Sequence, residues 1–219
     1  MGYVANKIFQ HRQRICVNPD SAKLISRADI PADFNKKPVY IIGGGPSLIG
    51  LKYVHISDGY IIGINKAFMF YPVLLNYAMD PQFFDWCYFP TTEEEYELHN
   101  ALKNFSGLKV FLKTQHRQVF NQQCHFISAN NQPRISLDTS EGIYAGSNSG
   151  FGALMLAIAL GAQKIGLLGY DFSIINNRTH WHNGYEKTRN DAKMAEKLIR
   201  FMECFDLVAQ DIKQHNIFV

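Results

Sequence analysis

The sequence predicts an α/β fold with a Rossmann-like, mainly parallel sheet flanked by helices, arranged as a single domain. Short apolar runs rich in β-branched residues alternate with helical patterns, and several of these runs end in a glycine or a polar residue. Buried parallel strands have this pattern because helices cover both faces of the sheet and ligands collect at its carboxyl edge. The length of 219 residues suits one domain with elaborations.

The ordered fold is expected to begin at Val39. Residues 1–38 are polar and contain three prolines, so we interpret them as an N-terminal arm with one short helix at most, and residues 39–219 as the α/β domain. The apolar run Val39–Ile42 predicts a buried strand that opens into the glycine turn Gly43–Gly45, and Pro46 fits the first turn of a following helix. Further strands are expected at residues 60–65, 74–80, 109–112, 125–128, 164–169 and 217–219.

Three helical segments are expected between and after these strands. An acidic, aromatic segment between Phe83 and Phe105 carries Glu93–Glu95 on a solvated face. Residues 151–160 are small or apolar all round, which predicts a buried helix that ends at Gly161. An amphipathic helix near the carboxyl end is marked at helical spacing by Ala195, Leu198, Ile199, Met202 and Phe205.

Composition and charge exclude several classes of protein. Hydrophobic residues make up 47% of the chain and charged residues 19%, which excludes a disordered chain. The net charge of +3 is too small and too scattered for a protein that wraps duplex nucleic acid, but it suits an anionic small ligand. The cysteines lie far apart, and the longest apolar run is shorter than the ~20 residues that span a bilayer. We therefore expect reduced thiols, no membrane span and a cytoplasmic location, and an oligomer is not excluded.

The glycine turn is the first candidate site. Glycines after a strand let the backbone approach a ligand, and the free amides of a following helix then point at an anion, so we expect Gly43, Gly44, Gly45 and Ser47 to hold a nucleotide phosphate. The third glycine of the dinucleotide fingerprint is missing, and Asn65 replaces its acidic residue, which disfavours a dehydrogenase. A purely structural strand-to-helix turn is the alternative.

Further polar residues are expected at the same edge of the sheet. Asn65, Asp80 and Asp171 each end a predicted strand, so a parallel sheet brings them to the glycine turn, although each could instead cap a turn or hold a loop. Asn148, Ser149 and Gly150 begin a predicted helix and could supply a second anion or ribose contact. The alternative there is a helix cap formed by Ser147 or Ser149.

The polar loop after Asp171 contains His180, Trp181 and His182. A neutral histidine can take a proton from a hydroxyl nucleophile, so these two histidines are the candidates for a general base. They could also hold a metal ion, but the neighbouring sequence offers no third ligand and no metal site is predicted. Surface residues without a role are the alternative. The G-x-S-x-G motif of serine hydrolases is absent from the sequence.

Taken together, these motifs resemble two families. The matching segments are Ile41–Leu48, Asn65, Asn148–Gly150 with Ala157–Gly161, and Gly169–Phe172. They resemble bacterial sialyltransferases that use CMP-activated sialic acid, and they also resemble the 6-hydroxymethylpterin diphosphokinase-like family. The resemblance covers about residues 39–205 and implies a nucleotide-binding α/β domain.

The sialyltransferase resemblance implies a role for each matching residue. It places the CMP moiety on Gly43, Gly44, Gly45, Ser47, Asn65, Asn148, Ser149 and Gly150, and it implies His182 as the general base with His180 as the alternative. This chain departs from that family at Gly44, where the family has asparagine, and at Gly146 and Ser147, where it has arginine. The histidine loop is also shorter. The resemblance implies a glycosyltransferase-like enzyme that takes a nucleotide-sugar donor, a CMP-sugar or another, and a hydroxyl acceptor, with no required cofactor.

The diphosphokinase-like resemblance implies a different chemistry at the same edge. Members of that family bind ATP, and acidic residues hold Mg²⁺ for pyrophosphoryl transfer. Asp80 and Asp171 are the candidates here, and Lys52 and Lys66 are the cations nearest to the glycine turn. Magnesium-dependent diphosphate transfer to a pterin-like alcohol is therefore the second hypothesis, and a nucleotide-binding protein without catalysis is the third.

Overall fold

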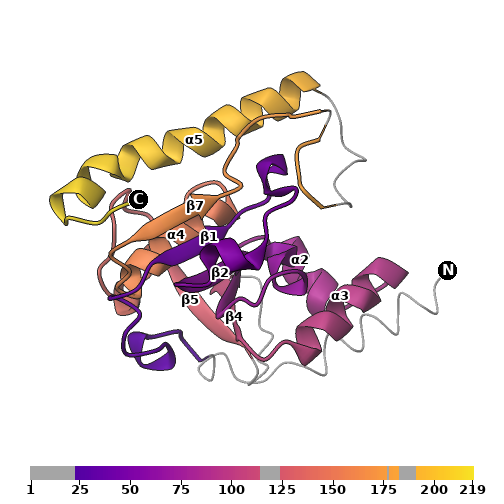
Figure 1. Ribbon diagram of the computed structural model, residues 1–219, viewed down its shortest axis with the longest axis horizontal. Coiled ribbons are helices and arrows are strands. Elements are labelled where there is room, and N and C mark those ends of the chain that lie inside the picture. The colour runs from indigo at the N-terminus through magenta and orange to yellow at the C-terminus, as the bar shows by residue number, and fades with distance from the viewer. Residues whose placement is uncertain (1–22, 114–123, 177, 183–190) are drawn as a thin grey trace.

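The computed structural model describes residues 23–113, 124–176, 178–182 and 191–219. Within these ranges seven parallel strands form one sheet in the order β6-β5-β4-β3-β2-β1-β7 (Figure 1). The strands are β1 (Val39–Ile42), β2 (Tyr60–Ile64), β3 (Leu75–Ala78), β4 (Leu108–Lys113), β5 (His125–Asn130), β6 (Ile143–Tyr144) and β7 (Ile165–Leu168). This sheet and its helices confirm the predicted Rossmann-like α/β fold.

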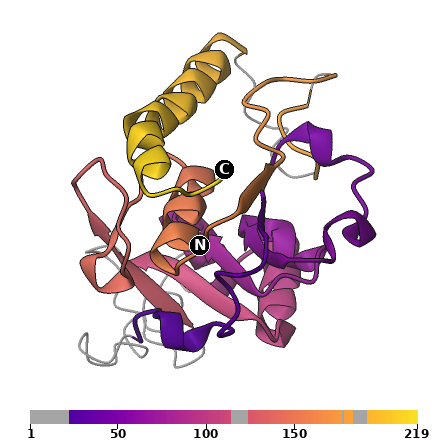
Figure 2. The same ribbon diagram turned by 60° about the vertical axis from the view of Figure 1, so that its left-hand side comes forward.

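Helices cover both faces of the sheet. The helices α2 (Pro81–Tyr88) and α3 (Glu93–Asn104) pack on one face, and α4 (Ser149–Ala159) packs on the other. Outside α4 lies α5 (Asp191–Gln214), which adds a further layer on that side (Figure 2). Residues Phe151 to Ala159 of α4 are all buried, which confirms the helix predicted from its uniformly small and apolar residues.

The order of the strands creates a topological switch point at β1. The sheet grows from β1 through β2 to β6 on one side, and α4 then returns the chain to β7 on the other side of β1. In register, Ile41 of β1 pairs with Ile62 of β2 and with Leu167 of β7. In open α/β sheets, ligands bind in the crevice outside the carboxyl ends of the strands at such a point. The glycine turn after β1 and Gly169 after β7 both lie there.

The helix that we predict after the glycine turn is present only as a short 3-10 helix. This helix has three residues, Pro46–Leu48. The turn bends toward the end of β7 because the Gly45 amide donates to the Gly169 carbonyl at 2.8 Å and the Ser47 amide donates to the Asp171 carboxylate at 2.9 Å. A helix this short has no N-terminal dipole with which to hold a phosphate.

The helical segment predicted between Phe83 and Phe105 is two helices. Pro90 lies between α2 and α3, and proline lacks the amide proton that a continuous helix requires. Thr92 then begins α3 with a capping box, in which its hydroxyl accepts from the Glu95 amide. The predicted solvated face is present, since Glu93 and Glu94 are exposed.

The C-terminal helix has the predicted type, but only part of its predicted apolar face is covered. Cys204 and Val208 of α5 are buried, whereas the predicted core residues Ile199 and Met202 are 53% and 42% exposed. Phe205, another residue of the predicted stripe, is half-buried and packs against the same core cluster as Cys204 and Val208. The strand predicted at residues 217–219 is reduced to one parallel bridge between Phe218 and Lys164.

The described part of the predicted arm belongs to the core of the domain. Ile25, Ile30 and Phe34 are each 7% exposed or less, and they pack in the same apolar cluster as α4. The Ile25 amide donates to the Phe126 carbonyl of β5 at 2.8 Å. Residue 38 is therefore no boundary in the packing, while residues 1–22 lie outside the described part of the chain.

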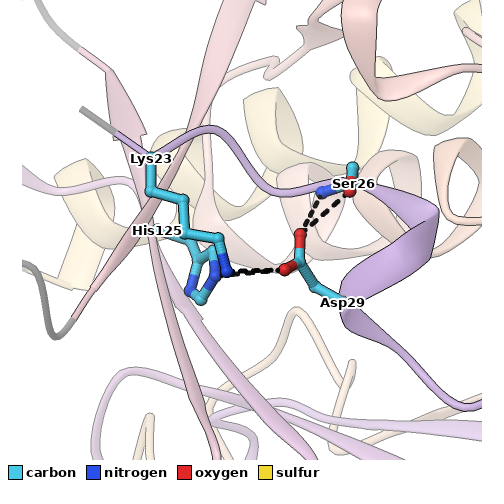
Figure 3. Close-up of polar contacts among 4 residues, drawn as sticks. All are labelled: Lys23, Ser26, Asp29 and His125. Atoms are coloured by element: carbon cyan, nitrogen blue, oxygen red, sulfur yellow. Dashed lines mark hydrogen bonds and ion pairs between the residues drawn. The ribbon is translucent and has the colours of Figure 1, made fainter. Parts of the chain in front are cut away.

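A polar cluster fixes this segment to the amino end of β5. The Asp29 carboxylate accepts from the amide and hydroxyl of Ser26, both at 2.9 Å, and from Lys23 Nζ at 2.7 Å (Figure 3). His125 Nε2 lies 3.6 Å from the same carboxylate. Burial opposes ionisation of Asp29, but its bonds to Lys23 and Ser26 outweigh this and lower its pKa. Burial also lowers the pKa of His125.

Candidate functional site

A cavity of about 520 Å³ lies at the carboxyl edge of the sheet, at the switch point. We call it the switch-point cavity. Ten of the twelve predicted site residues line it: Gly43, Gly44, Gly45, Asn65, Asp80, Asn148, Ser149, Gly150, His180 and His182. Its size is within the range of small-molecule sites. Of the three polar residues predicted at strand ends, Asn65 and Asp80 thus line the same cavity at this edge of the sheet.

The other two predicted residues, Ser47 and Asp171, bond to each other. The Asp171 carboxylate accepts from the Ser47 amide at 2.9 Å, and neither residue lines the cavity. The contact fastens the segment after β7 to the glycine turn, which is the loop-holding alternative that we considered for Asp171. Asp171 and Asp80 therefore do not form the pair of cavity carboxylates expected for a shared Mg²⁺ ion.

Two of the three amides of the glycine turn bond to carbonyl groups at the carboxyl end of β7. The Gly43 amide donates to the Leu168 carbonyl at 2.7 Å, and the Gly45 amide donates to the Gly169 carbonyl. A Cβ atom at Gly43 would lie only 2.6 Å from the Gly169 oxygen, so the close approach of β1 and β7 requires glycine there. The structure thus favours the structural interpretation of this turn over the predicted phosphate cradle.

The turn also carries the histidine loop. The backbone amide of Trp181 donates to the Gly44 carbonyl and its indole Nε1 donates to the Gly43 carbonyl, both at 3.0 Å. The His180 ring lies on Gly44, where a Cβ atom would come within 2.9 Å of His180 Cδ2. The glycine turn therefore positions the candidate base loop against the cavity.

The two histidines lie close together on the cavity wall. Their ring centroids are 5.6 Å apart, and His180 Nδ1 is hydrogen-bonded to the Thr179 hydroxyl at 2.9 Å. Burial, with the nearby His182 and Lys197, lowers the pKa of His180 to about 4. His180 is therefore neutral at neutral pH. Within the described residues, no group of three or more His, Cys, Asp or Glu side chains is placed to hold a metal ion.

The N-terminus of α4 lines this cavity. Asn148 caps the helix: its side-chain oxygen accepts from the Phe151 amide at 2.8 Å, while its Nδ2 donates to the Phe201 carbonyl at 3.3 Å. The cap is thus Asn148, not Ser147 or Ser149. The amides of Ser149 and Gly150 have no acceptor among the described residues, as is usual in the first turn of a helix. These amides carry the positive end of the helix dipole.

The residues at the ends of β2 and β3 have structural roles as well. Asn65 has a φ of +53°, a left-handed conformation that asparagine tolerates better than most residues, and its carbonyl accepts from Asn76 Nδ2 at 2.9 Å. Its own side-chain oxygen is buried and has no partner among the described residues. Asp80 caps α2 by accepting from the Gln82 amide at 2.8 Å, while still lining the cavity.

The structure adds residues that we did not predict for the site. Lys197, Met194, Leu198 and Phe201 of α5 line the cavity, and Lys197 Nζ lies 5.4 Å from the centre of the Phe201 ring. Lys197 is the one lysine among the described lining residues, whereas the candidates from the sequence, Lys52 and Lys66, do not line the cavity. The position of Leu198 on the apolar face of α5 was the only local signal for this group.

Tyr170 and Phe172 complete the apolar side of the cavity. The Tyr170 hydroxyl donates to the Gly150 carbonyl at 2.9 Å, which ties the end of β7 to the first turn of α4. The Tyr170 and Phe172 rings meet edge to face at 6.0 Å. The cavity thus combines an apolar wall with a small number of polar groups, as binding sites for small molecules do.

No protein-family model, curated protein or solved structure matches this chain. None of the helices among the described residues is both long and apolar enough to cross a membrane. The function of the switch-point cavity is therefore argued from its own geometry.

Proposed function

We propose that this protein is a glycosyltransferase-like enzyme that binds a nucleotide-activated sugar in the switch-point cavity and transfers the sugar to a hydroxyl acceptor. One observation carries the proposal: unpaired amides of α4, the ammonium group of Lys197 and the two loop histidines line one cavity at the carboxyl edge of the sheet. An anion-binding end and candidate bases are what transfer from a phosphate-linked donor requires. The resemblance of residues 39–205 to CMP-sialic-acid-dependent sialyltransferases supports the same chemistry.

The charges of the cavity favour a donor with few phosphates. Its described lining contains one lysine, Lys197, and one carboxylate, Asp80. The Ser149 and Gly150 amides with Lys197 suit a single phosphodiester, such as that of a CMP-sugar. A triphosphate with Mg²⁺ requires more carboxylates and cations, and Asp171 is turned away to the Ser47 amide. The diphosphokinase hypothesis therefore loses its expected magnesium ligands.

In the proposed reaction His182 is the general base. The acceptor oxygen attacks the donor's anomeric carbon, the bond from that carbon to the phosphate oxygen breaks, and the nucleotide leaves with the electron pair while His182 takes the hydroxyl proton. Lys197 and the α4 amides stabilise the charge that develops on the leaving phosphate. We assign His180 to positioning, because a histidine with a pKa of about 4 is a weak base at neutral pH.

The test is a thermal-shift panel of CMP, UDP, GDP, ADP and ATP, each with and without magnesium. A nucleotide that binds only the native state raises the melting temperature by mass action. We expect CMP to stabilise the protein without magnesium, and we expect the shift to shrink in Lys197→Met but not in the control Lys213→Met at the far end of α5. No shift with any nucleotide, or an undiminished CMP shift in Lys197→Met, would contradict the proposal.

A further inference from the structure

A second cavity lies on the other side of the histidine loop. It has a volume of about 400 Å³, and its walls include Ile49, Leu51, Phe70, Tyr71, Arg178 and Trp181. We call it the Trp181 cavity. Residues of the loop line both cavities: His180 and His182 line the switch-point cavity, and Arg178 and Trp181 line this one. The Trp181 and His182 rings meet edge to face with their centroids 5.0 Å apart, so a molecule bound against Trp181 would lie close to the candidate base.

The walls of this cavity are aromatic and are held in place. The Trp181 ring meets Phe70 edge to face at 4.8 Å and Tyr71 at 5.7 Å, and the indole is fixed by its bond to the Gly43 carbonyl. Phe70 and Ile49 are each 58% exposed. Two exposed apolar side chains thus lie beside a fixed aromatic wall, an arrangement that suits a ring-bearing molecule.

Arg178 gives the cavity its charge. The backbone of Arg178 forms reciprocal hydrogen bonds with that of Ile175, at 2.9 and 3.0 Å. These bonds close a tight turn and fix the position of the Arg178 backbone. Within the described part of the chain, the exposed guanidinium group forms no ion pair. A guanidinium fork matches a carboxylate or a phosphate group in two parallel hydrogen bonds. No acidic residue is among the described residues that line this cavity.

We propose that the Trp181 cavity binds the acceptor of the transfer reaction, and that this acceptor is an anionic glycoside. Its ring or apolar aglycone packs on Trp181 and Phe70, and its acidic group binds Arg178. This places a sugar hydroxyl at the loop that carries His182. The inference rests on the proposed function for its reaction, but the binding site itself can be tested without a donor.

The probes are a matched pair of molecules. Phenyl β-D-glucuronide has a carboxylate where phenyl β-D-glucoside has a hydroxymethyl group. Phenyl β-D-glucoside 6-phosphate tests a phosphate as the acidic group. The chain has two tryptophans, so in a Trp86→Phe background the intrinsic emission reports on Trp181 alone. We expect the glucuronide or the 6-phosphate to bind about tenfold more tightly than the glucoside, as for a charge-assisted contact at an exposed site.

Two variants connect this preference to the cavity. Arg178→Gln should remove the preference for the acidic glycoside, and the exposed Arg134→Gln should retain it. Phe70→Ala should weaken all three glycosides, because it removes apolar wall without touching the charge. Equal binding of the neutral and acidic glycosides to the parent protein, absence of binding, or a preference that survives in Arg178→Gln would overturn the inference.

The outcome is separable from that of the proposed function. The CMP thermal shift depends on Lys197 and should be unchanged in Arg178→Gln. Charge-dependent glycoside binding without any nucleotide shift would refute the donor site and keep the Trp181 cavity. A nucleotide-induced thermal shift without glycoside binding would refute the Trp181 cavity as an acceptor site and keep the donor site.

Discussion

Replacing Ile25 by alanine tests whether the segment before β1 is part of the domain. Ile25 is 1% exposed and packs in the cluster formed around α4. Its truncation removes three buried carbon groups at about 0.8 kcal/mol each, which gives ~2.4 kcal/mol. The cavity left behind adds to this, so we expect a loss of about 3 kcal/mol in the free energy of unfolding. The neighbouring Leu24 is 47% exposed, and Leu24→Ala should cost less than about 1 kcal/mol.

Urea unfolding followed by circular dichroism measures both variants. The transition midpoint should shift clearly in Ile25→Ala and little in Leu24→Ala, with an unchanged slope, because both variants unfold to a similar chain. A loss in Ile25→Ala as small as that in Leu24→Ala would show that residues 23–38 form an arm whose removal the domain tolerates. Our account of the core would then be wrong.

Further predictions concern the site and its pH dependence. His182→Ala should lose about 10²- to 10⁴-fold in turnover and retain its CMP thermal shift; equal turnover would remove His182 from the mechanism. Transfer activity should survive EDTA, and strict magnesium dependence would favour diphosphate transfer instead. The native pKa values of His180, about 4, and His125 are both lowered, so the unfolded chain binds protons more readily below pH ~6.5. The urea midpoint should therefore be constant above pH ~6.5 and should fall as the pH is lowered from ~6.5 toward about 4. The fall should be smaller in His125→Phe. A midpoint that rises on acidification would contradict the assigned shifts.

The sequence predicts the site residues whose positions depend on where a strand ends and on the direction in which the strand runs. Asn65 and Asp80 follow apolar runs, and in a parallel sheet all carboxyl ends meet at one edge, so local patterns are enough to bring such residues together. The helix α4 was predicted from its own residues, which are small or apolar all round. Each of these predictions depends only on a residue's place in its own element and on the handedness of α/β connections.

The parts that the sequence does not predict depend on contacts between distant segments. Asp171 accepts from Ser47, which is 124 residues away, and no local pattern shows that this bond occupies the amide expected to hold a phosphate. Lys197 enters the cavity because α5 crosses outside α4 at the switch point, and its periodicity alone does not fix which stripe faces inward. The prolines and polar residues of the first 38 positions likewise favour an arm, although Ile25 and Phe34 in that segment are buried in the core.

The glycine turn illustrates how one motif can have two meanings. Glycine is required at positions 43 and 45 because β1 and the segment that ends β7 approach closely there. The amides of both glycines are hydrogen-bonded to carbonyl groups at the end of β7. The carbonyl groups of Gly43 and Gly44 point the other way and hold Trp181. Because Trp181 is fixed in this way, the residues on either side of it face the switch-point cavity, and its own ring faces the second cavity. In the proposed reaction the turn therefore acts through the loop that it positions, and the proposed phosphate site is the first turn of α4, where the Ser149 and Gly150 amides have no acceptor among the described residues.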